Sequence, residues 1–179
     1  MKSIKGWWFA PHDNKLANGD GRKIKVGATH KIEGEIIPCQ RGLHLSPKIL
    51  DALSYSPGPI IYKVEGCGEI IAHGNPVDKY VCSQRAYIAG GVDISNTLMK
   101  FARLCALDVI KLWNAPPVVL EYLKTGKAEL RDAARDAARA AAGDAAGDAA
   151  WAAAWAAAGD AARVKQNKRL TAMVNRIIK

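Results

Sequence analysis

The sequence lacks any long apolar segment. No stretch of about 20 apolar residues is free of charge, so we expect no membrane-spanning helix. The N-terminal residues MKSIKGWWFAP contain no apolar run of the length found in signal peptides. We therefore expect a cytoplasmic protein that does not interact with a membrane.

The chain also lacks the cysteine and histidine spacings of metal sites. Its four cysteines, Cys39, Cys67, Cys82 and Cys105, include no Cys-x-x-Cys pair, and no histidine lies at zinc-ligand spacing from them. We predict no metal site, and we predict that the cysteines are buried, reduced thiols, because free cysteine is among the most buried residue types. A P-loop and a nucleophile elbow are likewise missing.

Acidic residues are scarce at both ends of the chain, whose formal net charge is +9. Residues 2–25 contain six Lys or Arg residues and two Asp, and residues 164–179 contain five Lys or Arg and no acid. Such charge attracts nucleic acid or acidic partners, and it also keeps small proteins soluble. Aromatic and basic residues are not interleaved as stacking sites for single strands require, so nucleic-acid binding is the weaker alternative.

Residues 1 to about 90 contain the short alternating segments that are typical of strands. We predict strands over residues 4–10, 23–32, 35–39, 42–45, 60–65, 69–72 and 80–88. The segments 60–65 and 69–72 form either a strand pair or one bulged strand across Gly66-Cys67-Gly68. Ser46-Pro47 predicts a helix that ends near Tyr55, with Ser46 as its N-cap. Trp7 and Trp8 are adjacent on a strand and so face opposite sides.

After Gly90-Gly91 the period of the apolar residues changes from two to about 3.6, which predicts helices. The first helix begins at Asp93 or Ser95, either of which can cap it, and a second covers 117–124 with Gly126 past its end. The pattern predicts an α+β fold. Its head, residues 1–126, is a small, mostly antiparallel strand-rich part to about residue 90, followed by helices over 93–124; residues 127–179 form a tail.

The tail begins with a four-residue repeat, DAAR-DAAR-AAAG-DAAG-DAAW-AAAW-AAAG-DAAR from Asp132. Alanine favours helix, and each four-residue step drifts by about 40° around a helix of 3.6 residues per turn. Three interpretations fit: one long helix or helical hairpin packed on the head, a self-associating rod anchored by Trp151 and Trp155, or a spacer. The end is amphipathic, and we expect its apolar residues to dock on the head or on a second copy. These apolar residues are Leu170, Met173, Val174 and Ile177.

A run of motifs along nearly the whole chain resembles a family of phage and prophage proteins. The motifs are RGLHLS from Arg41, IYKVEGCGEI from Ile61, FARLCALDVIKLW from Phe101 and the alanine-rich repeat. The resemblance implies a phage or prophage origin and a location in the host cytoplasm. It implies no particular reaction.

Residues 41–55 also resemble the NAD-binding signature of ADP-ribosyltransferases. The matching residues are Gly42, Leu43, Leu45, Ser46, Ala52 and Tyr55. His44 stands where that family has a tyrosine that stacks on nicotinamide. The sequence departs from the family at two places: its first strand reads Gly-Trp-Trp-Phe in place of a His-Gly element, and a late strand has Gln84 where a catalytic glutamate is expected.

These observations define one set of candidate ligand-binding residues. The set is Trp8, Arg41, His44, Ser46, Tyr55 and Arg85. The alternative interpretations are a buried strand histidine for His44 and surface positions for Arg41 and Arg85.

We expect a non-enzymatic, phage-type accessory protein that acts on host defence or host machinery. Its head would bind a host or phage protein or a nucleotide-like ligand, and it would need no cofactor. One alternative is an ADP-ribosyltransferase-like enzyme that uses NAD, or an inactive relative that binds a nucleotide. The other is a nucleic-acid-binding protein that uses the basic termini.

Overall fold

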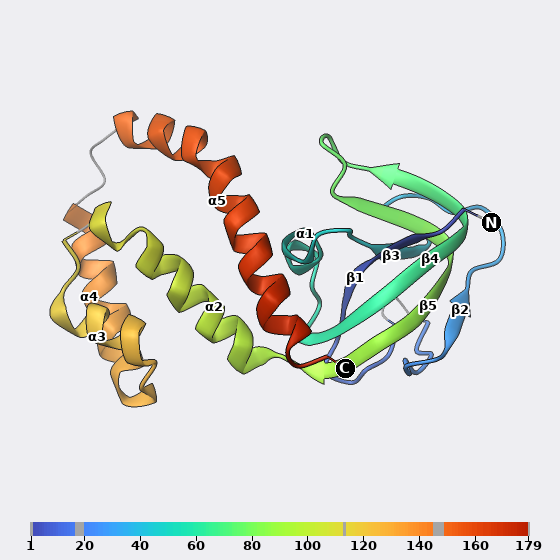
Figure 1. Ribbon diagram of the computed structural model, residues 1–179, viewed down its shortest axis with the longest axis horizontal. Coiled ribbons are helices and arrows are strands. Elements are labelled where there is room, and N and C mark those ends of the chain that lie inside the picture. Colours follow the sequence, from blue (N-terminus) through green and yellow to red (C-terminus); the bar gives the residue numbers. More distant parts are fainter. Residues whose placement is uncertain (1, 17–19, 113, 145–148, 179) are drawn as a thin grey trace. The chain divides into compact units, whose positions relative to one another are not determined.

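The protein has an α+β fold with an antiparallel sheet followed by helices (Figure 1). The computed structural model describes residues 2–16, 20–112, 114–144 and 149–178, with the backbone alone for 141–144 and 149–158. The chain forms two compact units. The sheet unit comprises Met1–Ser95 and Asn167–Lys179, and the helical unit comprises Asn96–Gln166. This grouping differs from the division at residue 126 that the sequence suggested.

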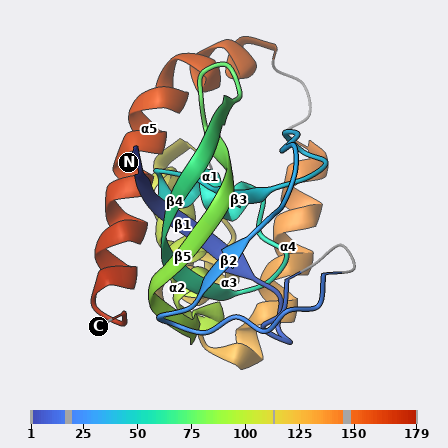
Figure 2. The same cartoon turned by 90° about the vertical axis from the view of Figure 1, so that its right-hand side faces the viewer.

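The sheet unit is built around two long strands that pair with each other, β4 (Ile60–His73) and β5 (Lys79–Asp93). β1 (Ile4–Ala10) pairs with the other edge of β4. The short strands β2 (Thr29–Lys31) and β3 (Leu43–Leu45) both pair with the free edge of β5, one after the other along it (Figure 2). All these pairings are antiparallel.

The sheet curls until the end of β3 meets β1. The Trp7 amide donates to the Ser46 carbonyl at 2.8 Å, and the Ser46 amide donates to the Trp7 carbonyl at 3.0 Å. Gly6 permits this approach, because a Cβ at that position would lie 2.5 Å from the Ser46 carbonyl oxygen. Inside the curl, Trp8 packs against Tyr62 and Tyr87, with ring centroids 6.3 and 6.0 Å apart.

The C-terminal end of the chain completes the sheet unit. Helix α5 (Ala149–Asn175) runs into it, and Leu170 and Val174 are completely buried. The Leu50 amide, in helix α1 (Ile49–Ser54), donates to Asn167 Oδ1 at 3.2 Å. The amphipathic end was expected to dock on the head or on a second copy, and the structure groups it with the strands of the head. The buried set differs at one position, because Ile178 is buried while Ile177 is 39% exposed.

The helical unit contains α2 (Ser95–Asp108), α3 (Pro117–Thr125) and α4 (Arg131–Asp144), with 3-10 turns at Ile110–Leu112 and Ala128–Leu130. Two expected ends are confirmed. Asp93 accepts a hydrogen bond from the Ser95 amide at 2.8 Å, and Gly126 adopts the left-handed conformation with φ of 70°. Residues 145–148, which would decide between a long helix and a hairpin, lie outside the described residues. None of the helices in the described ranges is both long and apolar enough to cross a membrane.

Several local predictions were wrong. Of the predicted strand 23–32, only Thr29–Lys31 pairs in the sheet. The predicted strand 35–39 does not form: Ile37 makes an isolated bridge with Arg41, and a turn lies between them. Ser46 does not cap α1, because the helix begins only at Ile49; its cap position is Lys48, which makes no side-chain cap bond. The backbone of Ser46 is paired with Trp7 instead. β4 is one bulged strand, and β5 continues through Gly90-Gly91 to Asp93.

Candidate functional site

A cavity of about 500 Å³ lies within the sheet unit. Its lining comes from β1, β3, the start and middle of β5, the turn at residues 39–42, α1 and the segment after it, with Leu16, Asp20 and Ile32. All six candidate residues of the sequence line it, together with Trp7, Cys39 and Lys79. Their role in ligand binding stays a prediction, but the fold brings them to one place from distant parts of the chain.

Arg85 is the most deeply buried charged residue of this cavity. It lies in the middle of β5, opposite His30 of β2 and Gly66 of β4, and is 1% exposed. Nη1 donates to the His44 carbonyl at 2.5 Å, while Nε and Nη2 donate to Tyr87 Oη at 3.3 and 2.8 Å. The guanidinium carbon lies 3.9 Å from the centroid of the Trp8 ring, a cation–π contact.

None of these partners carries a negative charge. Within the part of the chain that the structure describes, Arg85 has hydrogen bonds and ring contacts but no carboxylate in ion-pair distance. Burial lowers the pKa of Arg85, although the guanidinium stays protonated because its usual pKa is so high. A buried ion without a counter-ion costs several kcal/mol. A guanidinium has five N–H donors, and the bonds above use three, so two are left for another acceptor.

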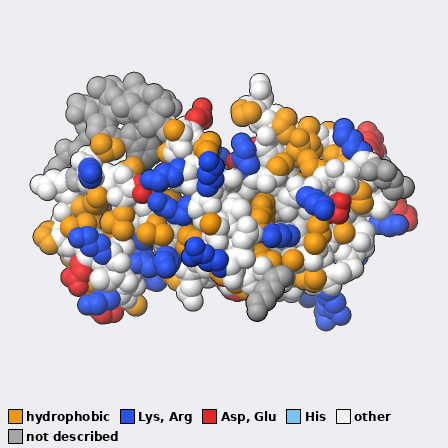
Figure 3. Space-filling model, in the orientation of Figure 1, with side chains coloured by type: hydrophobic (Ala, Val, Ile, Leu, Met, Phe, Trp, Pro, Cys, Tyr) orange, Lys and Arg blue, Asp and Glu red, His pale blue; other side chains and the backbone are white. Residues whose placement is uncertain are grey.

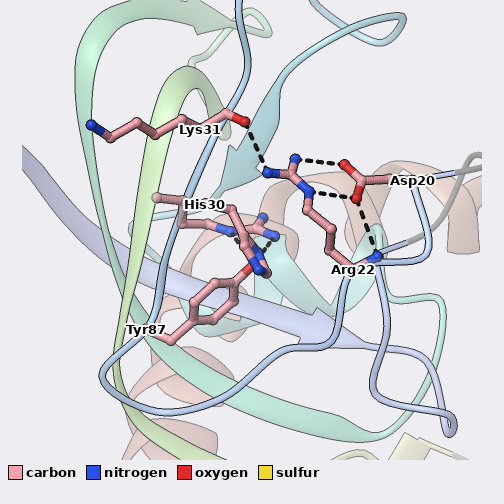
Figure 4. A network of polar contacts seen from close by, with 6 residues as sticks. Asp20, Arg22, His30, Lys31 and Tyr87 are labelled. Atoms are coloured by element: carbon pink, nitrogen blue, oxygen red, sulfur yellow. Dashed lines mark hydrogen bonds and ion pairs between the residues drawn. The ribbon is translucent and has the colours of Figure 1, made fainter.

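A polar network next to Arg85 determines the hydrogen bonding of Tyr87 and the protonation of His30 (Figure 4). Tyr87 Oη accepts from Arg85 and therefore donates its hydrogen to His30 Nδ1, 3.0 Å away. Burial, followed by the charges of Arg22 and Arg85, lowers the pKa of His30, so the imidazole is neutral at neutral pH. Asp20 is the acidic residue among the described lining residues, and it is paired with Arg22 at 2.6 Å.

Lys79 is a second buried cation at the cavity, 6% exposed. Its Nζ lies 3.8 Å from the centroid of the Tyr55 ring and donates to Cys39 Sγ at 3.3 Å. Tyr55 Oη in turn donates to Asp78 Oδ2 at 2.6 Å, and this bond raises the pKa of Tyr55 to about 12. Lys79 was not among the candidates because the strand was predicted to begin at Tyr80. The signal was its spacing, since Lys79 alternates with the buried Val81 on one face of β5.

His44 is a neutral side chain that lines the same cavity. Strand alternation directs the Leu43 and Leu45 side chains to the interior of the curl and His44 to the opposite face. Burial, followed by the charges of Lys79, Arg85 and His73, lowers the pKa of His44 to about 4. Its imidazole is therefore neutral at neutral pH, and its carbonyl accepts from Arg85.

The remaining candidates differ in their exposure. Arg41 is exposed, and its Nη2 donates to the Glu33 carbonyl at 2.5 Å. Ser46 is buried, and Tyr55 is 49% exposed. The Trp151 and Trp155 side chains, predicted to mediate self-association, lie outside the described residues.

In the described residues, no group of three or more His, Cys, Asp or Glu side chains is placed to hold a metal ion. Comparison of the chain with protein-family models, with curated proteins and with solved structures found no match.

Proposed function

We propose that the sheet unit is a non-enzymatic binding module for an anionic, nucleotide-like ligand. The observation that carries this proposal is Arg85, a completely buried guanidinium that lines a cavity and has only neutral partners. A phosphate group offers the countercharge and the paired acceptors that a guanidinium binds best.

The rest of the lining suits a phosphate attached to a flat, polar ring system. Trp7, Trp8 and Tyr55 supply aromatic faces, and Lys79 and Arg41 supply further positive charge. Aromatic rings stack on nucleobases without depending on their sequence. A volume of about 500 Å³ is within the range of sites for small ligands.

The transferase alternative needs a carboxylate beside the reacting sugar. Gln84, at the position where the resemblance places the catalytic glutamate, pairs with Lys31 and Cys67 and is not among the lining residues of the described chain. Asp20 is already paired with Arg22. We therefore propose that NAD, if it enters the cavity, is bound as a ligand and is not consumed as a substrate.

Nucleic-acid binding by the basic termini is the less favoured alternative. On the face drawn in Figure 3, Lys and Arg side chains are spread among apolar ones and do not form one continuous patch. The C-terminal basic segment contains Leu170 and Val174, which the sheet unit buries. A phage-type role in host cells rests on the sequence resemblance and stays a prediction.

The proposal is tested by calorimetric titration of the full chain with ATP, NAD and inorganic phosphate. We expect ATP or NAD to bind more tightly than phosphate, and NAD to be recovered intact after incubation. The Lys31→Met variant is a matched control, because Lys31 is an exposed cation outside the cavity whose side chain points away from the network in Figure 4. The absence of binding by all three compounds would refute the proposal, and hydrolysis of NAD would favour the enzyme.

A further inference from the structure

Cys39 differs from the other three cysteines in its surroundings. It is exposed, Cys67 and Cys105 are half-buried, and Cys82 is buried, where burial raises the pKa of its thiol to about 11. The prediction that all four are buried was therefore wrong for Cys39. It lies in the turn between β2 and β3, at the wall of the cavity.

The backbone of Cys39 has an uncommon conformation. Its φ is 65°, in the left-handed region that residues with a Cβ rarely adopt. Such strained positions occur preferentially at functional sites, where the surrounding structure holds them in place. Here the turn is held by backbone bonds on both sides of Cys39, since the amides of Gln40 and Arg41 donate to the Ile37 carbonyl.

Two nitrogen atoms flank the Cys39 sulfur. His73 Nε2 lies 3.5 Å from Sγ, and Lys79 Nζ lies 3.3 Å from it. His73 and Lys79 are directly opposite each other on β4 and β5, so the pair is positioned by the sheet and not by a mobile loop. A thiol next to a base and a cation is the arrangement of an activated nucleophile.

The Lys79 ammonium has no competing carboxylate among the side chains that the structure describes. Asp78, its neighbour in sequence, is hydrogen-bonded to Tyr55, whose ring covers the ammonium. The charge of Lys79 therefore acts on the sulfur and on the cavity. A cation in contact with a sulfur stabilises the thiolate, which is the form of cysteine that attacks electrophiles.

We propose that Cys39 is a nucleophilic thiol that exchanges with small anionic disulfides at the wall of the cavity. In this step His73 Nε2 takes the thiol proton and Sγ attacks one sulfur of the disulfide. The new bond joins Sγ to that sulfur, and the old S–S bond breaks. The second sulfur leaves as a thiolate with the electron pair of the broken bond. Cys39 is oxidised and the departing half of the disulfide is reduced, so no other oxidant is needed.

The preference for an anionic disulfide follows from the positive charges around the Cys39 sulfur. Lys79 is in contact with it, and Arg41 and Arg85 line the same cavity. Tyr55 is a neutral phenol because its pKa is raised to about 12, and His44 is neutral because its pKa is lowered to about 4. Asp78 is an acid close to this group, and Tyr55 occupies one of its oxygens. The acid of the cavity lining, Asp20, is paired with Arg22. This inference does not depend on nucleotide binding.

The test is the rate of reaction with 5,5′-dithiobis(2-nitrobenzoate), a disulfide with two carboxylates, followed by absorbance and assigned to each cysteine by peptide mass mapping. We expect Cys39 in the folded full chain to react at least about fivefold faster than the thiols of the urea-unfolded chain, the factor expected for one unit charge at about 4 Å in water. Cys39→Ser should remove this fast phase.

Three variants separate activation from simple exposure. Lys79→Met should slow Cys39 at least about fivefold because it removes one unit charge, whereas Lys79→Arg, which keeps the charge, should retain a rate within about twofold of the parent chain. His73→Gln should also slow Cys39 at least about fivefold, because it removes the group that takes the thiol proton. A Cys39 rate equal to that of the unfolded thiols would overturn the inference. Equal rates for the His73→Gln variant and the parent chain would also overturn it, whether or not Lys79→Met folds.

Discussion

Replacing Arg85 by methionine separates the effect of the buried cation on stability from its effect on ligand binding. The change keeps a side chain of similar length and removes the charge. Relative to the parent chain, the variant loses three hydrogen bonds from a charged donor, each worth about 1.5 kcal/mol, and a desolvated cation–π contact of about 2 kcal/mol. It regains the desolvation penalty of an unpaired buried ion, which is several kcal/mol. Because the two sides are similar, we expect the free energy of unfolding to change by no more than about 2 kcal/mol.

Ligand binding should respond very differently. Removing one partner of a buried charge pair typically costs about 2 kcal/mol or more in binding, which weakens affinity by about 30-fold. The assay is urea unfolding, followed by circular dichroism, together with calorimetric titration of ATP on the same Arg85→Met preparation. Lys31→Met serves as the control and should change neither quantity appreciably.

Two results would refute this reasoning. Loss of more than about 4 kcal/mol of stability would mean that Arg85 is kept for the fold and that its neutral partners compensate its burial. Unchanged ATP affinity in a folded Arg85→Met variant would mean that the ligand binds without the guanidinium.

Three further predictions follow from burial and pKa. The pKa of His44 is lowered to about 4, so between pH 6.5 and about 4 the unfolded chain binds a proton that the folded chain does not. The free energy of unfolding, measured by urea titration, should therefore fall by up to about 3 kcal/mol as the pH falls across this interval. The fall should be smaller in His44→Gln. Leu170→Ala should lower the free energy of unfolding by about 2–5 kcal/mol, because Leu170 is completely buried, whereas the exposed Ile177→Ala should lower it by less than about 1 kcal/mol. Equal effects of the two substitutions would contradict docking of the C-terminal end on the sheet unit. Gly6→Ala should lower the free energy of unfolding by about 1–3 kcal/mol, because the new Cβ would collide with the Ser46 carbonyl. No change in stability would argue against the contact between β1 and the end of β3.

Local chemistry made part of the fold predictable. β1 has the predicted bounds, since a short segment rich in aromatic residues ends at a proline. The Asp93 cap and the left-handed Gly126 follow from the chemistry of helix ends. The C-terminal apolar spacing predicted burial, but only the structure identifies the sheet unit as the surface that receives it.

Long-range contacts explain the predictions that failed. Ser46 looks like a helix cap within its own segment, yet Trp7, far away in the sequence, uses its backbone groups. Residues 23–28 alternate like a strand but are held by scattered loop bonds, such as Gly27 N–H to the Tyr87 carbonyl. The six residues proposed from the sequence line one cavity. Lys79 and Cys39 were not proposed, because only the folded chain brings the Cys39 sulfur into contact with Lys79 and His73.

A crystal structure of the full chain grown with ATP tests the central claim most directly. We predict phosphate oxygens about 2.7–2.9 Å from the Arg85 guanidinium, the distance of a charge-assisted hydrogen bond, with the ligand inside the cavity lined by Trp8 and Lys79. ATP bound at another surface, or a cavity that stays without ATP at saturating concentration, would contradict the claim.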